Sequence, residues 1–258
     1  MAPLFTRAGT TALGIALLVG VWQAIHLIWG PFVLPSPAAT LRSLQAFLAE
    51  PAMAQSLART TWAAVLGFVG GAAVGIVLGA IAGRSRLIFE LLNPSIVAIL
   101  AVPPIAWVIL ALLWFGATGT GAALTAALAL MPLVFAATVQ GMRTIDPTLE
   151  AMATAFGAGP GLRLLHVRLP QVTAYVIPAL ATAHGIAWKA VVMAEVLGAG
   201  QGLGADLATA RAHLDLPRAL ALVVLVAAIV LLIDGLVLDP LRRRVEAWRN
   251  PDRGMAAC

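Results

Sequence analysis

Residues 60–83 read TTWAAVLGFVGGAAVGIVLGAIAG, a stretch without a single charged side chain. A helix needs roughly 20 predominantly apolar residues to cross about 30 Å of hydrocarbon. Glycine recurs at every fourth position, at Gly67, Gly71, Gly75, Gly79 and Gly83. Small residues at this spacing leave a groove on one helix face that a neighbouring backbone can approach closely in lipid. The stretch therefore predicts a membrane-spanning helix, and we favour packing within the subunit over a dimer seam.

The whole chain has the composition of a membrane protein. Of its 258 residues, 61% are apolar and only 10% are charged. In a soluble domain about 45–50% of the residues are apolar and about 25% are charged. Its single cysteine, Cys258, excludes a disulfide scaffold. The net charge of +5 arises mostly from arginines beside apolar runs, so no basic face with interleaved aromatic residues indicates nucleic-acid binding.

The length criterion gives six candidate spans, at about 11–29, 60–83, 88–115, 122–141, 171–197 and 218–238. We therefore expect an all-α polytopic protein, with residues 1–258 forming one transmembrane domain. The first run ends at Gly30-Pro31 without an Ala-x-Ala site, so we interpret it as a retained span and not a cleaved signal peptide. Pro103-Pro104 must bend or interrupt the third span.

Two segments between the spans are polar or rich in proline. Residues 31–37 predict an extended linker, followed by a short helix at about 38–49 on the membrane surface. Residues 142–168 are too polar to span, yet they keep helical spacing over 147–156.

The basic residues predict the orientation. If the N-terminus is cytoplasmic, four arginines lie on the outer side of the membrane and eleven lie on the cytoplasmic side. The outer set is Arg42, Arg59, Arg211 and Arg218; the inner set is Arg7, Arg84, Arg86, Arg143, Arg163, Arg168, Arg242, Arg243, Arg244, Arg249 and Arg253. Because basic loops stay inside, both termini and the 142–168 loop should be cytoplasmic.

The residues give no sign of an enzyme. The only lysine, Lys189, precedes Ala190 and Val191, so the Gly-Lys-Ser/Thr of a phosphate-binding loop is missing. If transport uses ATP, the ATPase must be another polypeptide. The four histidines are scattered over different elements, without metal-ligand spacing, at His26, His166, His184 and His213.

The 146–170 segment reads DPTLEAMATAFGAGPGLRLLHVRLP. It resembles the coupling-loop motif of binding-protein-dependent ABC importer permeases: Glu-Ala-Ala, a glycine six residues after the glutamate, and Ile-x-Leu-Pro ten residues further on. Gly157 supplies the glycine, and Val167, Leu169 and Pro170 supply the last element. The triplet aligns as Ala151-Met152-Ala153, which displaces Glu150 by one position.

Further matches extend the resemblance to the nitrate/sulfonate/taurine subgroup of these permeases. They are Leu34-Pro35-Ser36-Pro37, Pro103-Pro104-Ile105-Ala106-Trp107, Trp114-Phe115-Gly116 and Ala194-Glu195-Val196-Leu197-Gly198. The resemblance implies a type I ABC importer permease (MetI-like) fold in a bacterial inner membrane. It also implies a second permease subunit, for which we expect a homodimer, two cytoplasmic ATPases that hold ATP and Mg²⁺, and a periplasmic solute-binding protein. This chain would have no cofactor of its own.

By this resemblance the loop would couple to the ATPase through a set of nine residues: Glu150, Ala151, Met152, Ala153, Phe156, Gly157, Ala158, Leu169 and Pro170. Met152 and Phe156 are four residues apart, so they should share a helix face and fill a hydrophobic groove. Gly157 should permit a turn that a side chain would obstruct or disfavour.

Ionisable residues within a membrane are costly and mark pathways or internal pairs. The pathway candidates are Pro103, Pro104, Trp107, His184, Trp188, Lys189 and Glu195. His184 and Trp188 are one turn apart and could both face a cavity. Lys189 either contacts solute or has a snorkelling or interhelical role. Glu195 either gates the pathway or binds backbone of the 198–204 loop, and six residues separate it from Lys189, so direct pairing is not expected.

Three functions remain to be compared: an ABC importer permease, an ion-coupled secondary transporter and a non-transporting scaffold. The permease would transport a small solute, expected to be an anion such as nitrate, a sulfonate or taurine. A secondary transporter commonly has paired halves, and we find no internal repeat. A scaffold leaves the broken third span and the charged fifth span unexplained. We therefore favour the permease.

Overall fold

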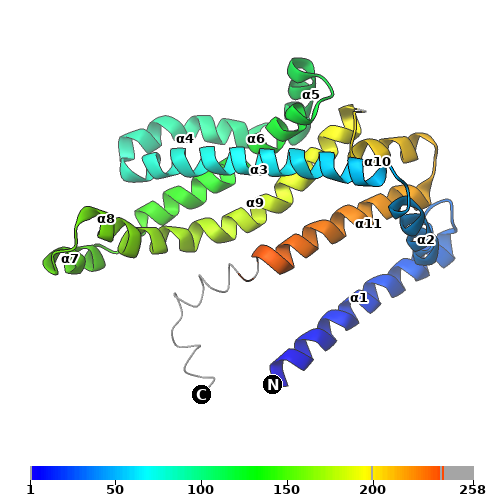
Figure 1. Ribbon diagram of the computed structural model, residues 1–258, viewed down its shortest axis with the longest axis horizontal. Coiled ribbons are helices and arrows are strands. Elements are labelled where there is room, and N and C mark those ends of the chain that lie inside the picture. The colour runs from blue at the N-terminus through cyan, green and yellow to red at the C-terminus, as the bar shows by residue number, and fades with distance from the viewer. Residues whose placement is uncertain (1, 199, 239, 241–258) are drawn as a thin grey trace.

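The computed structural model describes residues 2–198, 200–238 and 240, and every regular element in these ranges is helical, as expected for the all-α class (Figure 1). The long helices are α1 (Ala2–Trp29), α3 (Met53–Arg84), α6 (Gly119–Arg143), α9 (Leu169–Gly198) and α11 (Leu216–Ile233). The shorter elements are α2 (Pro37–Leu48), α4 (Arg86–Ala101), α5 (Pro104–Phe115), α7 (Pro147–Ala155), α8 (Pro160–Arg163) and α10 (Leu203–Ala212), with π-helical turns η1 (Leu164–Arg168) and η2 (Asp234–Leu238).

The described ranges contain 5 helices long and apolar enough to cross a membrane, or 6 if α4 and α5 form one bent span. These two helices meet at 92°, which confirms the break expected at Pro103-Pro104. Several helices extend beyond the apolar runs; α3, for example, begins at Met53 and includes the polar Gln55 and Arg59. Apolar composition marks where hydrocarbon is crossed, whereas backbone hydrogen bonding continues into the polar flanks.

The centre of the molecule is formed by α3, α6 and α9. Each glycine of the ladder in α3 faces α6: a Cβ at Gly71 would lie 2.6 Å from the carbonyl oxygen of Ala127, and one at Gly75 would lie 2.9 Å from that of Met131. The interpretation of the ladder as packing within the subunit is therefore confirmed. Trp188 of α9 and Leu130 of α6 are buried in the adjoining core.

Figure 1 shows α7 and α8 at one end of the long helices, and α5 and α10 at the other. The 18-residue apolar window of α1 is 0% buried, and this helix diverges from the central layer. The basic residues Arg242, Arg243, Arg244, Arg249 and Arg253, together with Cys258, lie outside the described residues.

Candidate functional site

The loop from 146 to 170 begins with a capped helix. The Oδ1 atom of Asp146 accepts a hydrogen bond of 2.7 Å from the backbone N–H of Thr148, and Pro147 occupies the first turn of α7. A side-chain acceptor before the helix and proline at its first position are both typical of helix starts. The side chain of Gln171 joins the two ends of the loop, since its Oε1 accepts from the N–H of Asp146 and its Nε2 donates to the carbonyl of Val167, both at 2.8 Å.

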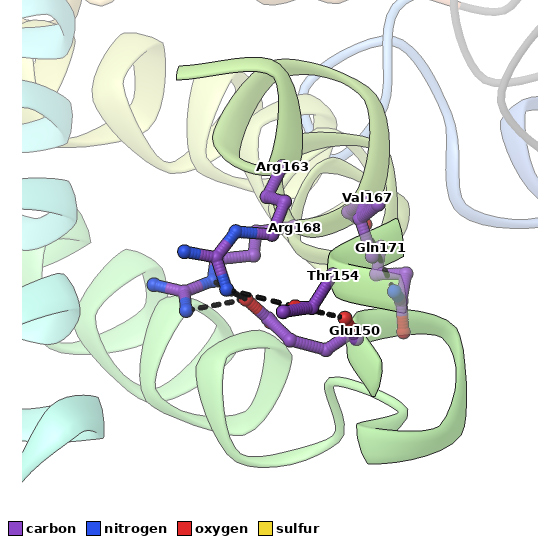
Figure 2. A network of polar contacts seen from close by, with 6 residues as sticks. All are labelled: Glu150, Thr154, Arg163, Val167, Arg168 and Gln171. Carbon is purple, nitrogen blue, oxygen red and sulfur yellow. Dashed lines mark hydrogen bonds and ion pairs between the residues drawn. The ribbon is translucent and has the colours of Figure 1, made fainter. Parts of the chain in front are cut away.

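Glu150 lies at the centre of a polar network inside this loop (Figure 2). Its carboxylate accepts hydrogen bonds from Nε of Arg168 at 2.9 and 3.0 Å and from Nη2 at 2.6 Å. Nη1 of Arg163 lies 3.8 Å from Glu150 and donates to Oγ1 of Thr154 at 3.0 Å. The hydrogen bonds from Arg168 hold the pKa of Glu150 below its ordinary value. Glu150 thus binds α7 to the segment that leads into α9.

Apolar side chains remain exposed beside this network. Met152 is 53% exposed and Phe156 is 85% exposed. A groove of about 480 Å³ runs between the loop and the base of α9, with Met152, Ala153, Pro170 and Tyr175 among its walls. Large apolar groups with this exposure on a polar segment are typical of a surface that binds another protein.

Gly157 ends α7 in the left-handed region, with φ of +75°. Its N–H bonds to the carbonyl of Thr154, and the next N–H, from Ala158, bonds to Ala153 at 2.9 Å. A Cβ at Gly157 would meet nothing within 4 Å. Backbone conformation, and not lack of space, is therefore the reason that this turn favours glycine. Ala151 and Leu169, also expected in the coupling set, are exposed.

The residues expected in the pathway are distributed over four places. Pro103 and Pro104 form the bend between α4 and α5, and Nε1 of Trp107 donates across it to the carbonyl of Ile99 at 3.4 Å. In α9, His184 lies edge-on to Trp188 with ring centroids 6.4 Å apart, and Trp188 is buried in the core.

Lys189 is exposed on another face of α9, at a cleft of about 460 Å³. The walls of this cleft are otherwise apolar and come from α5, α9, α10 and α11; they include Ile105, Leu207 and Val223. Among the described residues, no ion pair joins Lys189 to Glu195. This agrees with their spacing in the sequence, which indicated that they would not pair directly.

Glu195 is 7% exposed and forms a second polar network at the opposite end of the helices from the loop. Its carboxylate accepts from Oγ1 of Thr60, which lies 2.8 Å from Oε2, and from the N–H of Gly204 at 2.9 Å. The N–H of Leu203 donates to the same Thr60 hydroxyl at 2.9 Å. The expected bond to backbone of the 198–204 loop is thus present.

Sequence reasoning did not find Thr60, Arg163, Arg168 or Gln171 as site residues. The signal for the arginines was available, because Glu150 is the acidic residue nearest to two arginines on the same polar segment. No signal was available for Thr60, which lies 135 residues from its partner. Within the described residues, no group of three His, Cys, Asp or Glu side chains could hold a metal ion.

The chain is similar to several known proteins. A family model described as "Binding-protein-dependent transport system inner membrane component" matches residues 75–247. The chain is 31% identical to the putative aliphatic sulfonates transport permease protein SsuC of Escherichia coli, over 91% of this chain and 87% of that protein. It is 28% identical to the taurine transport system permease protein TauC of the same organism, over 95% and 92%.

A solved structure shares the fold. A chain of the MetNI methionine ABC transporter superposes with a TM-score of 0.56 at 20% identity, covering 76% of this chain and 99% of that one. At this identity the likeness shows the fold, which is that of a type I ABC importer permease.

Proposed function

The chain belongs to the family of binding-protein-dependent transport system inner membrane components, and on that premise we propose that it forms half of the translocation pathway of an ATP-driven importer for a small anion. As a member of this family it is a multi-pass inner membrane protein and a transport subunit without a cofactor of its own. The proposed partners are a second copy of the chain, two ATPase subunits and a periplasmic solute-binding protein.

The observation that carries the proposal is the 146–170 loop, which the contacts of Glu150 hold together and which has an exposed apolar surface. Arg168 and Arg163 hold Glu150 from the far side of the loop, so α7 has a fixed orientation relative to α9. Phe156 and Met152 remain free to bind a partner. A helix held rigidly against a long span and inserted in a second protein can transmit a change in that protein into the membrane. We propose that the ATPase receives this helix.

ATP and Mg²⁺ would bind to the ATPase, because this sequence has no Gly-Lys-Ser/Thr. The proposed cycle needs no chemistry in this chain, since nucleotide binding would move the loop and the loop would move α9. The arginine distribution supports a cytoplasmic loop. Cysteines introduced at Gln45 and Gly161 in a Cys258→Ala background should then react with impermeant reagents from opposite sides.

The proposed solute is small and carries an anionic group, as a sulfonate, taurine or nitrate does. Two relatives are named for sulfonate and taurine transport. The exposed ammonium of Lys189 in an otherwise apolar cleft supplies a charge that such a solute would complement.

Co-purification with the cognate ATPase in mild detergent tests the proposal. Phe156→Asp should lose most of the ATPase, because a buried aromatic anchor typically contributes on the order of 2 kcal/mol or more to an interface. Phe32→Asp is the matched control, since Phe32 is 92% exposed but lies in the turn between α1 and α2. Equal ATPase recovery with both variants would contradict the coupling role of the loop. Uptake that continues in membranes without ATP would favour an ion-coupled transporter.

A further inference from the structure

A groove of about 370 Å³ runs along the surface between α4 and α6, away from the Lys189 cleft and the Glu195 network. Its walls change in character along its length. Leu100 and Ile96 of α4 and Pro132 of α6 make one end apolar. Gln140 and Arg143 of α6 make the other end polar.

The polar end carries an unpaired cation. The guanidinium of Arg143 lies 4.0 Å from the centre of the Phe89 ring, and both residues line the groove. Among the residues that the structure describes, no carboxylate forms an ion pair with Arg143. Arg84 is at the same level, because the neighbouring Gly83 lies against Met142. This end is therefore positively charged.

The length of the groove matches one leaflet of a bilayer. From Pro132 to Arg143 the helix α6 rises about 16 Å at about 1.5 Å per residue. Half of a hydrocarbon core of about 30 Å is about 15 Å. With Arg143 at the membrane surface, the apolar end of the groove would thus reach the middle of the bilayer. Leu100 is 68% exposed there, so the groove is open to its surroundings.

We propose that this groove binds an anionic phospholipid, with the phosphate at Arg143 and an acyl chain along the apolar walls toward Leu100. A small hydrophilic anion would use only the polar end and would leave the apolar walls without a role. Anionic lipids collect at basic, membrane-surface clefts between helices, and each Lys or Arg near the surface increases their binding. The inference needs only that the chain spans a membrane, and it does not depend on the transported solute.

Native mass spectrometry of the full transporter, purified with added phosphatidylglycerol or phosphatidylcholine, tests the proposal. Arg143→Gln should reduce phosphatidylglycerol retention about five-fold and leave the low phosphatidylcholine retention unchanged. Arg211→Gln is the matched control, because Arg211 is an exposed arginine at the opposite end of the helices. Ala136→Trp should also displace the lipid, since Ala136 lines the groove, whereas Ala98→Trp on the exposed surface of α4 should not.

Three results would overturn the proposal. The first is equal phosphatidylglycerol retention by Arg143→Gln and Arg211→Gln. The second is displacement of the lipid by millimolar inorganic phosphate, which would assign the site to small anions. The third is efficient disulfide formation between two copies of an Ala136→Cys, Cys258→Ala chain, which would make the groove a contact between subunits. Monodisperse elution of each variant in size-exclusion chromatography reports that it is folded, whether or not an ATPase is bound.

Discussion

The guanidinium of Arg168 meets the carboxylate of Glu150 in three contacts of 2.6–3.0 Å, across 18 residues of sequence. The glutamate is one position away from its expected place in the coupling motif, and the structure places it inside the loop, not on the exposed surface. Its contribution is therefore to hold the loop together, while neighbouring apolar residues are left to bind a partner.

Glu150→Gln should reduce solute uptake several-fold, because it leaves the half-buried guanidinium of Arg168 without its counter-charge. Uptake in proteoliposomes, normalised to reconstituted protein, measures the effect. Glu90→Gln is the control: the Arg86–Glu90 pair has side chains that are 90% and 58% exposed, and such pairs contribute little. Normal uptake by Glu150→Gln would show that the loop does not need the ion pair between Glu150 and Arg168.

The same pair predicts the pH dependence of the loop. Arg168 lowers the pKa of Glu150 below 4.5, so the stabilisation is complete above about 4.5 and is lost as the pH falls through the lowered value. ATPase recovery should therefore be constant between about pH 6 and about pH 8, where the carboxylate is ionised. A decline toward pH 6 in the wild type that is absent in Glu150→Gln would contradict this assignment.

Gly157→Val should weaken ATPase binding because a β-branched residue at φ of +75° is strained by about 1–3 kcal/mol. ATPase recovery in detergent and ATP-driven uptake are the measurements. Gly161→Val is the comparison, since Gly161 also has no atom near its Cβ position but does not have a positive φ. If the two variants behave alike, the turn at Gly157 is not what positions the loop.

Gly71→Ala should destabilise the protein, whereas Gly70→Ala should not. A Cβ at Gly71 would lie 2.6 Å from the carbonyl oxygen of Ala127, and one at Gly70 would meet nothing within 4 Å. Overpacking of this kind costs about 1–3 kcal/mol, and alanine in an open helical position is slightly favourable. Thermal unfolding in detergent distinguishes the two. A similar loss of stability in both variants would mean that α3 does not pack on α6 through this face.

Lys189→Met should lower uptake while assembly with the ATPase and its basal activity stay normal. Lys189 is exposed in the α5–α9–α10–α11 cleft, so its removal disturbs no core packing. Lys189→Arg should retain more uptake, because it keeps the positive charge. If the Met variant transports at the normal rate, the lysine has a snorkelling or interhelical role instead.

Elements defined by local pattern could be predicted from the sequence. The apolar runs indicated the long helices, the proline pair indicated the 92° bend, and the glycine spacing indicated close helix packing. These features depend on backbone sterics and on the number of apolar residues that a helix needs to cross the bilayer. Both can be judged from a single sequence. Helix ends were less accurate because polar flanks remain helical, as in α3.

Long-range partners could not be predicted in the same way. Thr60 lies within α3, seven residues after its first residue, and nothing local shows that its hydroxyl meets Glu195 in another span. The sequence also could not show that Trp188 is buried while Lys189, the next residue, is exposed. That difference depends on which face of α9 meets α3 and α6, which is a property of the assembled bundle.

The contact of α3 with α6 has a consequence for how this subunit can move. Each glycine of the ladder lies against backbone or side-chain atoms of α6, so intermediate positions along the seam would bring atoms into collision. Sliding could occur only in steps of four residues, which is about 6 Å along the axis. We therefore expect α3 and α6 to move together and not to slide past each other. Outside this pair, the backbone departs from the regular α-helix at the α4–α5 corner and at the π-helical turn that precedes α9, and we expect bending at these two places.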